Sequence, residues 1–237
     1  ELEFVYGVKL NEETAYKAKE LVNQYKIVLT AHAPYYVNLN SIEDSKLKNS
    51  IRMVMESARA LHYSGGYSVC VHPGWYQKSS KEEAFERVKN AFKTINKMVK
   101  EEGYEVWVRP ETMEGSAKFG DLDEVLSVCE GLDFILPCID FAHLRFRNGW
   151  NDKESFEDIL NRVEVSLGKE ALKNMHIHVS GIKMDRAGTH LNLEESDMKW
   201  RDLIKVLKEY RVLGVLICES PNLEEDTLML KKYYEKL

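Results

Sequence analysis

The segment that decides the fold reads Phe134-Ile-Leu-Pro-Cys-Ile-Asp140-Phe-Ala-His143-Leu-Arg145. It starts as an apolar run of the kind found in strands that are buried on both faces. It then ends in a carboxylate and an imidazole, Asp140 and His143. Burying ionisable groups at the end of a dry strand is costly, so this pattern indicates that the strand tip enters a polar site.

The same pattern, an apolar run followed by His, Asp or Glu, recurs along the chain. The apolar runs predict strands over residues 1–6, 27–31, 67–71, 105–109, 134–139, 174–179 and 214–218. The stretches between them predict helices over residues 12–25, 43–63, 81–101, 122–129, 153–167, 197–210 and 223–234. Ser80 suits the N-cap of the third helix, and Gly103 suits the left-handed residue just past its end. Polar groups stand at or just past the strand ends, namely His32, His72, Glu111, Asp140, His143, His176, His178 and Glu219.

Alternating strands and helices predict a parallel sheet, which is either open and doubly wound or closed into a barrel. In an open sheet ligands gather at one crevice, so only some strand tips can converge. Here six successive strands carry polar groups at the same end, and only a closed ring lets all of them face one centre. We therefore predict an α/β TIM barrel with parallel strands and outer helices, forming a single domain over residues 1–237. Because we count seven strands instead of eight, we expect the first strand to be missing from this chain.

The composition bounds the class of protein. The chain has 237 residues, of which 44% are hydrophobic and 30% charged, as in a soluble domain of this size. Its net charge of −6 does not indicate a general affinity for nucleic acid. No apolar run approaches a membrane span, and no signal segment opens the chain. Without paired C-x-x-C spacing, the cysteines are interpreted as buried reduced thiols, which favours the cytoplasm: Cys70, Cys129, Cys138 and Cys218.

Each polar strand tip also has a plain structural interpretation. A single His at a strand end is most often a hydrogen-bonded structural residue. Asp140 or Glu219 alone could be a helix N-cap. The joint occurrence of histidines and acids on successive tips is harder to explain in this way, because burying them together calls for counter-ions. The set offers nitrogen and oxygen donors without thiolates, which suits zinc or manganese.

Other kinds of chemistry have weaker support in the sequence. Neither glycine-rich phosphate-binding motif occurs, and the G-x-S-x-G elbow of a serine nucleophile is absent too. A nucleotide cofactor is therefore not expected. Aromatic pairs follow two strand tips, Tyr35-Tyr36 after His32 and Trp75-Tyr76 after His72. They suit either packing or stacking on an unpaired base or sugar.

The polar tips belong to motifs that follow one another along nearly the whole chain. They are His32-Ala-Pro-Tyr35-Tyr-Val-Asn38-Leu, Val71-His72-Pro-Gly74, Glu111-Thr-Met-Glu-Gly115, Cys138-Ile-Asp140-Phe-Ala-His143, Met175-His176-Ile, His190-Leu-Asn-Leu and Leu216-Ile-Cys-Glu219-Ser-Pro221. In this order they resemble the endonuclease IV family of abasic-site endonucleases. That family is a TIM barrel that holds a trinuclear zinc cluster.

The resemblance implies two or three Zn²⁺ ions, with Mn²⁺ as an alternative at one site. It assigns the first metal to His32, His72 and Glu111, with Glu111 bridging to the second. It assigns the second metal to Asp140, His176 and Glu219, and the third to His143 and His190. Glu111 and Glu219 are the expected catalytic carboxylates, and the expected substrate contacts are Tyr35, Asn38 and Arg145.

This chain departs from the family pattern at the third metal. The family has an Asp two residues before the second His of that site, and here the position is Gly188. Asp185 lies nearby and is an alternative ligand through a different loop path.

The resemblance implies metal-dependent hydrolysis of phosphodiester bonds at abasic sites in damaged DNA. The expected enzyme is a monomer with neither a membrane partner nor a nucleotide cofactor. The candidates for phosphate contacts, which suit surface salt bridges equally well, are Arg145, Arg147, Lys183 and Arg186.

Two alternatives stay open at the level of the sequence. A sugar isomerase or epimerase would use Glu, Asp and His at strand tips without needing the pair His143 and His190, and the missing third-site Asp favours it. A degenerate barrel that binds damaged DNA or a sugar without turnover is the other alternative.

Overall fold

The computed structural model describes residues 1–185 and 188–237, and the chain divides into two units. The first unit contains Glu1–Glu111, Ala117–Gly120 and Val128–Pro137. The second unit contains Thr112–Ser116, Asp121–Ser127 and Cys138–Leu237. Arg186, one of the candidate phosphate contacts, lies outside the described residues.

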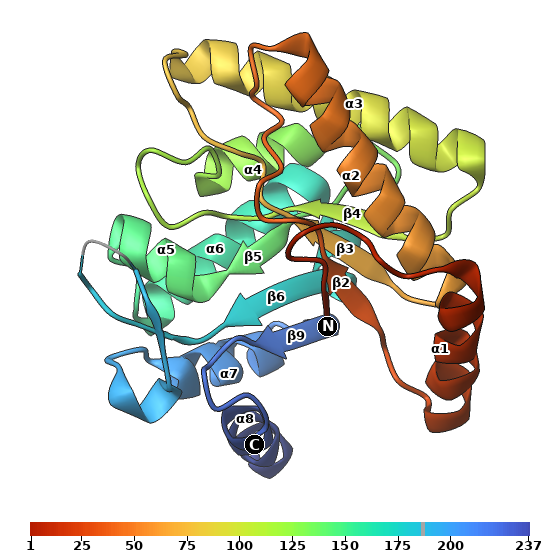
Figure 1. Ribbon diagram of the computed structural model, residues 1–237. Helices are drawn as coiled ribbons and strands as arrows, with labels where there is room; N and C mark the ends of the chain where they lie inside the picture. Colours follow the sequence, from red (N-terminus) through yellow and green to blue (C-terminus); the bar gives the residue numbers. More distant parts are fainter. Residues whose placement is uncertain (186–187) are drawn as a thin grey trace. The chain divides into compact units, whose positions relative to one another are not determined.

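The first unit is built on a parallel sheet with the strand order β1-β2-β3-β4. Its strands are β1 (Leu2–Glu3), β2 (Thr30–His32), β3 (Ser68–Val71) and β4 (Trp107–Pro110). Its helices are α1 (Glu12–Tyr25), α2 (Asp44–Tyr63) and α3 (Lys81–Glu102). Helix α2 packs against β2 and β3 and lies between α1 and α3 (Figure 1).

The second unit contains a parallel sheet with the order β5-β6-β9 and a small antiparallel pair, β7 and β8. Its strands are β5 (Cys138–Asp140), β6 (Met175–Val179), β7 (Gly181–Ile182), β8 (His190–Leu191) and β9 (Gly214–Cys218). Its helices are α5 (Phe141–Asn148), α6 (Lys153–Leu167), α7 (Trp200–Glu209) and α8 (Glu224–Lys236), with 3-10 turns at Lys169–Lys173 and Leu193–Glu195. Helix α4 (Leu122–Cys129) begins in the second unit and ends in the first.

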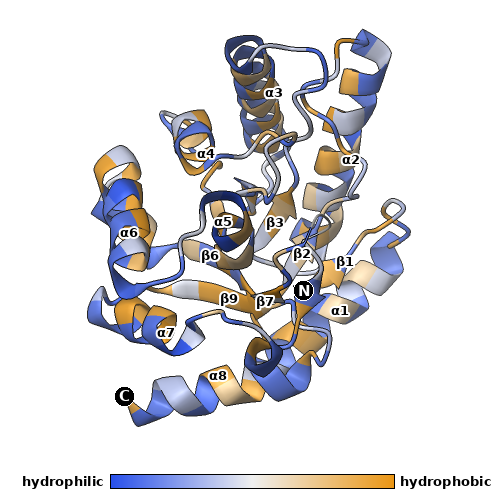
Figure 2. Cartoon of the chain, turned by 90° about the vertical axis from the view of Figure 1, so that its left-hand side faces the viewer, coloured by the Kyte–Doolittle hydropathy of each residue, from blue (hydrophilic) through white to orange (hydrophobic). Residues whose placement is uncertain are grey.

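Helices α3 and α6 each bury one apolar stripe, as their sequence periodicity predicts. In α3 the buried residues recur at helical spacing, namely Ala84, Val88, Ala91, Phe92, Ile95 and Val99. Ser80 caps this helix through a reciprocal capping box with Glu83, and Gly103 ends it in the left-handed conformation. Figure 2 shows the resulting stripes of hydrophilic and hydrophobic colour on α3 and α6. The predicted start and end of α3 are therefore confirmed.

The strands place side chains of opposite character on their two faces. In β3 every residue is buried, and Val69 and Val71 alternate with Ser68 and Cys70. Because side chains alternate along a strand, Cys70 shares its face with His72, which follows the last strand residue. The same alternation turns His32 in β2 and Glu111 after β4 toward one face of the first sheet.

All seven predicted strands are present, but β2, β4 and β5 lie further along the chain than predicted. Strand β2 begins at Thr30 because Ile27 and Val28 are 49% and 60% exposed instead of paired in the sheet. Strand β5 is confined to Cys138–Asp140, while Ile135 makes an isolated parallel bridge to Val108.

The sequence did not predict helix α5, the hairpin of β7 and β8, or the two 3-10 turns of the second unit. Within the described residues, no helix is both long and apolar enough to cross a membrane.

Candidate metal centres

The first unit brings together three of the predicted metal ligands, His32, His72 and Glu111, which we call the first cluster. They stand at the tips of β2, β3 and β4, and their ligand atoms lie within 4.8 Å of one another. Nε2 of His32 and Nε2 of His72 lie 3.3 Å and 3.1 Å from Oε2 of Glu111. The Glu111 side chain is only 1% exposed, so its charge is held away from bulk water.

The orientation of the His32 ring leaves Nε2 as the nitrogen that can bind a cation. Nδ1 lies 2.7 Å from the carbonyl oxygen of Ala33, which can only accept a hydrogen bond, so Nδ1 carries the proton. In the neutral ring Nε2 then presents a lone pair to the Glu111 carboxylate. Two acceptors in this position need a proton or a metal ion between them.

The protonation of His32 reflects this need. Burial lowers the pKa of His32, but the hydrogen bond to Glu111 and the negative charge of Glu111 raise it by more. The charges of Glu1 and Glu3 raise this pKa slightly further. Together they raise the pKa from 6.5 to about 9. Without a metal ion, the ring therefore takes up a proton at neutral pH, and a metal ion would have to displace that proton.

A buried thiol also contacts the first cluster. Sγ of Cys70 lies 3.1 Å from Oε2 of Glu111, and Cys70 is completely buried. The sequence predicted this cysteine to be simple apolar packing, so its contact with the carboxylate was missed. The available signal was its spacing, since it precedes His72 by two residues and shares its face of β3.

The loop after β2 covers the first cluster with an aromatic ring. The Tyr35 ring centroid lies 4.7 Å from that of His32 and 5.3 Å from that of His72. Its hydroxyl donates to Oε2 of Glu3 at 2.7 Å, and 40% of the residue is exposed. Tyr35 therefore stands where a bound substrate could contact it.

The predicted substrate contact Asn38 serves the loop itself. Its Oδ1 accepts a hydrogen bond from the Asn40 amide at 3.1 Å, and its own amide donates to Ser50. Gly74 approaches it so closely that an added Cβ would lie 2.2 Å from Oδ1 of Asn38. Nearby, a cavity of about 630 Å³ opens between the loops after β2 and β3, with Tyr36 and Trp75 in its wall.

The second unit holds another set of donors, Asp140, His178 and Glu219, which we call the second cluster. They come from β5, β6 and the end of β9, and their ligand atoms lie within 4.8 Å of one another. Oε1 of Glu219 lies 3.3 Å from Nδ1 of His178. The side chains of Asp140 and His178 are essentially inaccessible to water.

One of the two carboxylate oxygens of Asp140 accepts no hydrogen bond. Oδ1 accepts a hydrogen bond from the His143 amide at 2.7 Å, so Asp140 is the N-cap of α5. Oδ2 is buried and accepts no hydrogen bond. A buried carboxylate oxygen in this state calls for a counter-charge, and a divalent cation bound by this nitrogen and oxygen donor set supplies one. The residues present therefore fit a metal ion.

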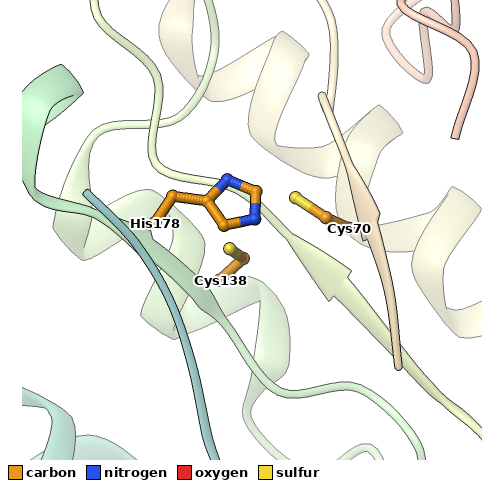
Figure 3. Close-up of side chains that lie close together, drawn as sticks. All are labelled: Cys70, Cys138 and His178. Carbon is orange, nitrogen blue, oxygen red and sulfur yellow. The ribbon is translucent and has the colours of Figure 1, made fainter. Parts of the chain in front are cut away.

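His178 occupies the place in the second cluster that the sequence assigned to His176. Both histidines lie on the same face of β6, since they are two residues apart, and their Nε2 atoms are 3.2 Å apart. His176 lies deeper along the strand, whereas His178 lies nearer the carboxyl end, where the polar groups gather. Figure 3 shows the His178 ring beside the thiol of Cys138. We therefore take His178 instead of His176 as the candidate ligand.

The predicted pair His143 and His190 also meets within the second unit. Their ring centroids are 5.7 Å apart, and both share a group of possible ligands with Asp140. Asp185 points elsewhere, because its carboxylate accepts from the Gly188 amide at 3.2 Å and lies 3.2 Å from Lys183. Glu114, which the sequence did not single out, approaches His143 with Oε2 at 3.7 Å from Nε2.

The basic side chains considered as phosphate contacts are engaged within the fold. Arg145 donates to Asp197 at 2.7 Å, and Arg147 lies 3.4 Å from Asp121. Lys183 lies 3.2 Å from Asp185. Of the two interpretations of these residues, the structure favours salt-bridge partners.

Clusters of imidazole and carboxylate donors at the carboxyl ends of parallel strands define an α/β protein with candidate metal-binding sites. The chain belongs to the xylose isomerase-like TIM barrel family, whose model matches residues 1–235. The predicted α/β TIM barrel is thereby confirmed.

Two relatives illustrate what the chain is similar to. An uncharacterized protein of Methanocaldococcus jannaschii is 45% identical over 241 residues, covering 100% of this chain and 87% of the relative. A probable endonuclease 4 of Mycoplasma pneumoniae is 27% identical over 210 residues, covering 84% of this chain and 70% of the relative. The resemblance to endonuclease IV drawn from the motifs is confirmed by such relatives.

Two solved structures share the fold. A D-tagatose 3-epimerase-like protein matches with a TM-score of 0.77 at 18% identity, covering 99% of this chain and 86% of that one. Endonuclease IV from Thermus thermophilus matches with a TM-score of 0.73 at 20% identity, covering 95% of this chain and 82% of that one. At these identities the matches establish the fold and do not choose between the two activities.

Proposed function

We propose that this protein hydrolyses phosphodiester bonds at abasic sites in DNA and depends on divalent cations, with Zn²⁺ as the first candidate. The observation that carries the proposal is the pair His143 and His190. A sugar isomerase needs only the carboxylate-rich donors, whereas this pair adds imidazoles suited to a further cation. The similarity to a probable endonuclease 4 supports the same choice.

When bound, the cations would neutralise charge developing on the phosphoryl oxygens and activate water as the nucleophile. The chain supplies the donors for them. His32, His72 and Glu111 would hold one ion, and the second cluster would hold another. No side chain needs to act as a nucleophile.

The surrounding residues fix these donors in place. The Ala33 carbonyl sets the tautomer of His32, and Cys70 contributes a further contact to Glu111. The Tyr35 ring packs against both histidine rings. A substrate that lacks a base at the scissile position suits such a site, because flipping that nucleotide out of the stack costs least.

We further propose that the chain works as a single domain and a monomer in the cytoplasm, without a nucleotide cofactor or a membrane partner. The four cysteines are buried and none of them is joined in a disulfide, which supports a reducing compartment.

The test is incision of a labelled duplex that contains one tetrahydrofuran residue as an abasic-site analogue. We expect cleavage on the 5′ side of the analogue that a chelator abolishes and Zn²⁺ restores. Glu111→Gln should lower the rate by roughly a hundredfold or more, because a carboxylate at the centre of the first cluster is lost. Glu101→Gln makes the same chemical change on the exposed face of α3 and should leave the rate unchanged.

A parallel assay tests the alternative function, a sugar epimerase, because the D-tagatose 3-epimerase-like structure shares the fold. Ketohexoses are incubated with the Zn²⁺- or Mn²⁺-loaded protein and examined for epimers. Absence of incision with both metals, together with epimer formation, would overturn the nuclease proposal in favour of a sugar epimerase.

A further inference from the structure

The thiol of Cys70 lies against the carboxylate at the centre of the first cluster. Its Sγ is 3.1 Å from Oε2 of Glu111. The same oxygen lies 3.3 Å from Nε2 of His32 and 3.1 Å from Nε2 of His72. One carboxylate oxygen is thus shared between two imidazole nitrogens and a sulfur atom.

The register of the first sheet places this thiol below the carboxylate. Along β3, Cys70 is paired with His32 of β2 on one side and with Arg109 of β4 on the other. Glu111 follows Arg109 by two residues, so it stands on the same face, one step nearer the carboxyl ends of the strands. Cys70 is completely buried, so it contacts Glu111 from the interior and not from the solvent side.

The backbone around Cys70 is bonded to both neighbouring strands. The Cys70 carbonyl accepts a hydrogen bond from the Ala33 amide at 2.9 Å, and the Ala33 carbonyl in turn accepts one from Nδ1 of His32. The Glu111 amide donates to the Val71 carbonyl at 3.0 Å. Main-chain bonds therefore set the positions of His32 and Glu111 relative to the thiol, and a change of the Cys70 side chain leaves these bonds in place.

Toward Glu111 the thiol acts as a hydrogen-bond donor. An ionised carboxylate only accepts hydrogen bonds, so the proton lies on the sulfur and is directed at Oε2. Among the described residues of the first unit, the group of possible ligands within 4.8 Å of one another contains His32, His72 and Glu111 but not Cys70. The sulfur is therefore not placed as a fourth ligand of the same ion.

A donor at this place has two effects on a bound cation. A carboxylate oxygen that binds a metal through one lone pair can still accept a hydrogen bond with the other, and this bond fixes the orientation of the carboxylate. The bond also offsets part of the cost of burying a negative charge, since the Glu111 side chain is only 1% exposed. Both effects favour the arrangement in which Glu111 binds a metal ion.

From these contacts we propose that Cys70 is a positioning residue of the first cluster. Its thiol donates a hydrogen bond to Glu111 and thereby strengthens the binding of a divalent cation by Glu111, His32 and His72. Cys70 itself does not bind the ion. The inference rests on the metal dependence within the proposed function, but not on its substrate.

The test compares a side chain that donates a hydrogen bond with a similarly small one that cannot. Zn²⁺ affinity is measured by competition with a chromogenic chelator, and Glu111→Gln identifies which ion belongs to the first cluster. Cys70→Ala should bind that ion roughly tenfold or more weakly, the usual cost of losing a hydrogen-bond partner of a metal ligand. Cys70→Ser keeps a donor at this place and should recover most of the lost affinity.

Cys129→Ala is the matched control, because it removes another buried thiol of the first unit. Cys129 lies at the end of α4 and belongs to none of the groups of possible ligands found among the described residues. This variant should bind Zn²⁺ as tightly as the unaltered chain. A role of Cys70 in packing alone would instead weaken Zn²⁺ binding in Cys70→Ser and Cys70→Ala alike.

Co²⁺ provides a spectroscopic measurement that separates a hydrogen-bond donor from a ligand. The thiolate is the form of cysteine that binds metals, and thiolate-bound Co²⁺ has an intense charge-transfer absorption in the near ultraviolet. We expect the spectrum of the Co²⁺-loaded protein to contain no such band that disappears in Cys70→Ala.

Equal Zn²⁺ affinity in Cys70→Ala and the unaltered chain would overturn the proposal, as would equal weakening in Cys70→Ala and Cys70→Ser. A thiolate band that disappears in Cys70→Ala would overturn it by making Cys70 a ligand. If Glu111→Gln loses no ion, the first cluster binds none and the proposal fails with it. Absence of incision alone would not overturn it, because none of these measurements uses DNA. Normal ion binding with no incision would instead remove the nuclease proposal.

Discussion

The raised pKa of His32 couples the first cluster to pH. In the folded, metal-free protein this pKa is about 9, above its ordinary value of 6.5, because the contribution of Glu111 outweighs burial. The protonated ring therefore stabilises the fold fully below pH 6.5 and loses this contribution as the pH rises through about 9.

We expect the free energy of unfolding of the chelated protein to fall by up to about 3 kcal/mol across this pH window, a figure that follows from the size of the pKa shift. Urea titrations at a series of pH values measure this decline. His32→Asn should flatten it, because the variant has no titrating ring at this position. An equal decline in the variant would show that other groups are responsible.

The two histidines of β6 allow a sharper test of the second cluster. His178→Asn should weaken one Zn²⁺ site by roughly tenfold or more, since it removes an imidazole that lies within 4.8 Å of the other ligand atoms. His176→Asn makes the same change two residues deeper on the same face and should affect metal binding much less. Zn²⁺ titration in competition with a chromogenic chelator measures both, and the reverse order of effects would restore His176 as the ligand.

At this scale the sequence predicted the kind of residue better than its identity. Strand tips rich in His and acids could be recognised, and the three members of the first cluster each follow a different strand, so they required no choice between two histidines on one strand. On β6 two histidines share one face, and the choice between them depends on how far the strand extends.

The capping box of α3 is a local device whose contribution can be measured. Ser80 accepts a hydrogen bond from the Glu83 amide at 3.2 Å, and the Glu83 carboxylate accepts one from the Ser80 amide at 2.9 Å. Ser80→Ala should lower the free energy of unfolding by about 1 kcal/mol in urea. Thr94→Ala also removes a hydroxyl from α3 and should have little effect, because that hydroxyl only bonds the Asn90 carbonyl at an exposed position.

Helices were predicted more reliably than strands, and the reason is physical. A helix carries its periodicity and both of its end signals within one local segment, as Ser80 and Gly103 show for α3. Where a strand of a parallel sheet begins depends on partners far along the chain. The sequence therefore did not show that β2 begins at Thr30, after the exposed Ile27 and Val28. Helix α5 was missed because Asp140 was interpreted as a strand tip, although it also begins the next helix as its N-cap.

For the whole molecule, metal ions should contribute a large share of stability. Buried clusters of carboxylates and imidazoles are costly without a counter-charge, and a ligand that binds only the folded chain stabilises it by mass action. At a thousandfold excess over the dissociation constant, one Zn²⁺ ion adds about 4 kcal/mol. For a chain of this length this corresponds to a rise in Tm of roughly 8–16 °C.

Scanning calorimetry of the chelated protein with and without added Zn²⁺ measures this shift. Mg²⁺ prefers oxygen ligands, so it should produce a much smaller rise than Zn²⁺ at the same concentration. A Tm that does not respond to Zn²⁺ would contradict metal binding at these clusters.

The four cysteines have a consequence that does not depend on catalysis. Each is at most 9% exposed, and burial raises the pKa of Cys129, so alkylating reagents can reach them only when the chain opens. Cys70 and Cys129 belong to the first unit, whereas Cys138 and Cys218 belong to the second. Each opening event is therefore recorded as an irreversible mass increase on an identifiable peptide. If the cysteines of one unit are alkylated at a different rate from those of the other, the two units open separately. If all four are alkylated at the same rate, the whole chain opens in one step.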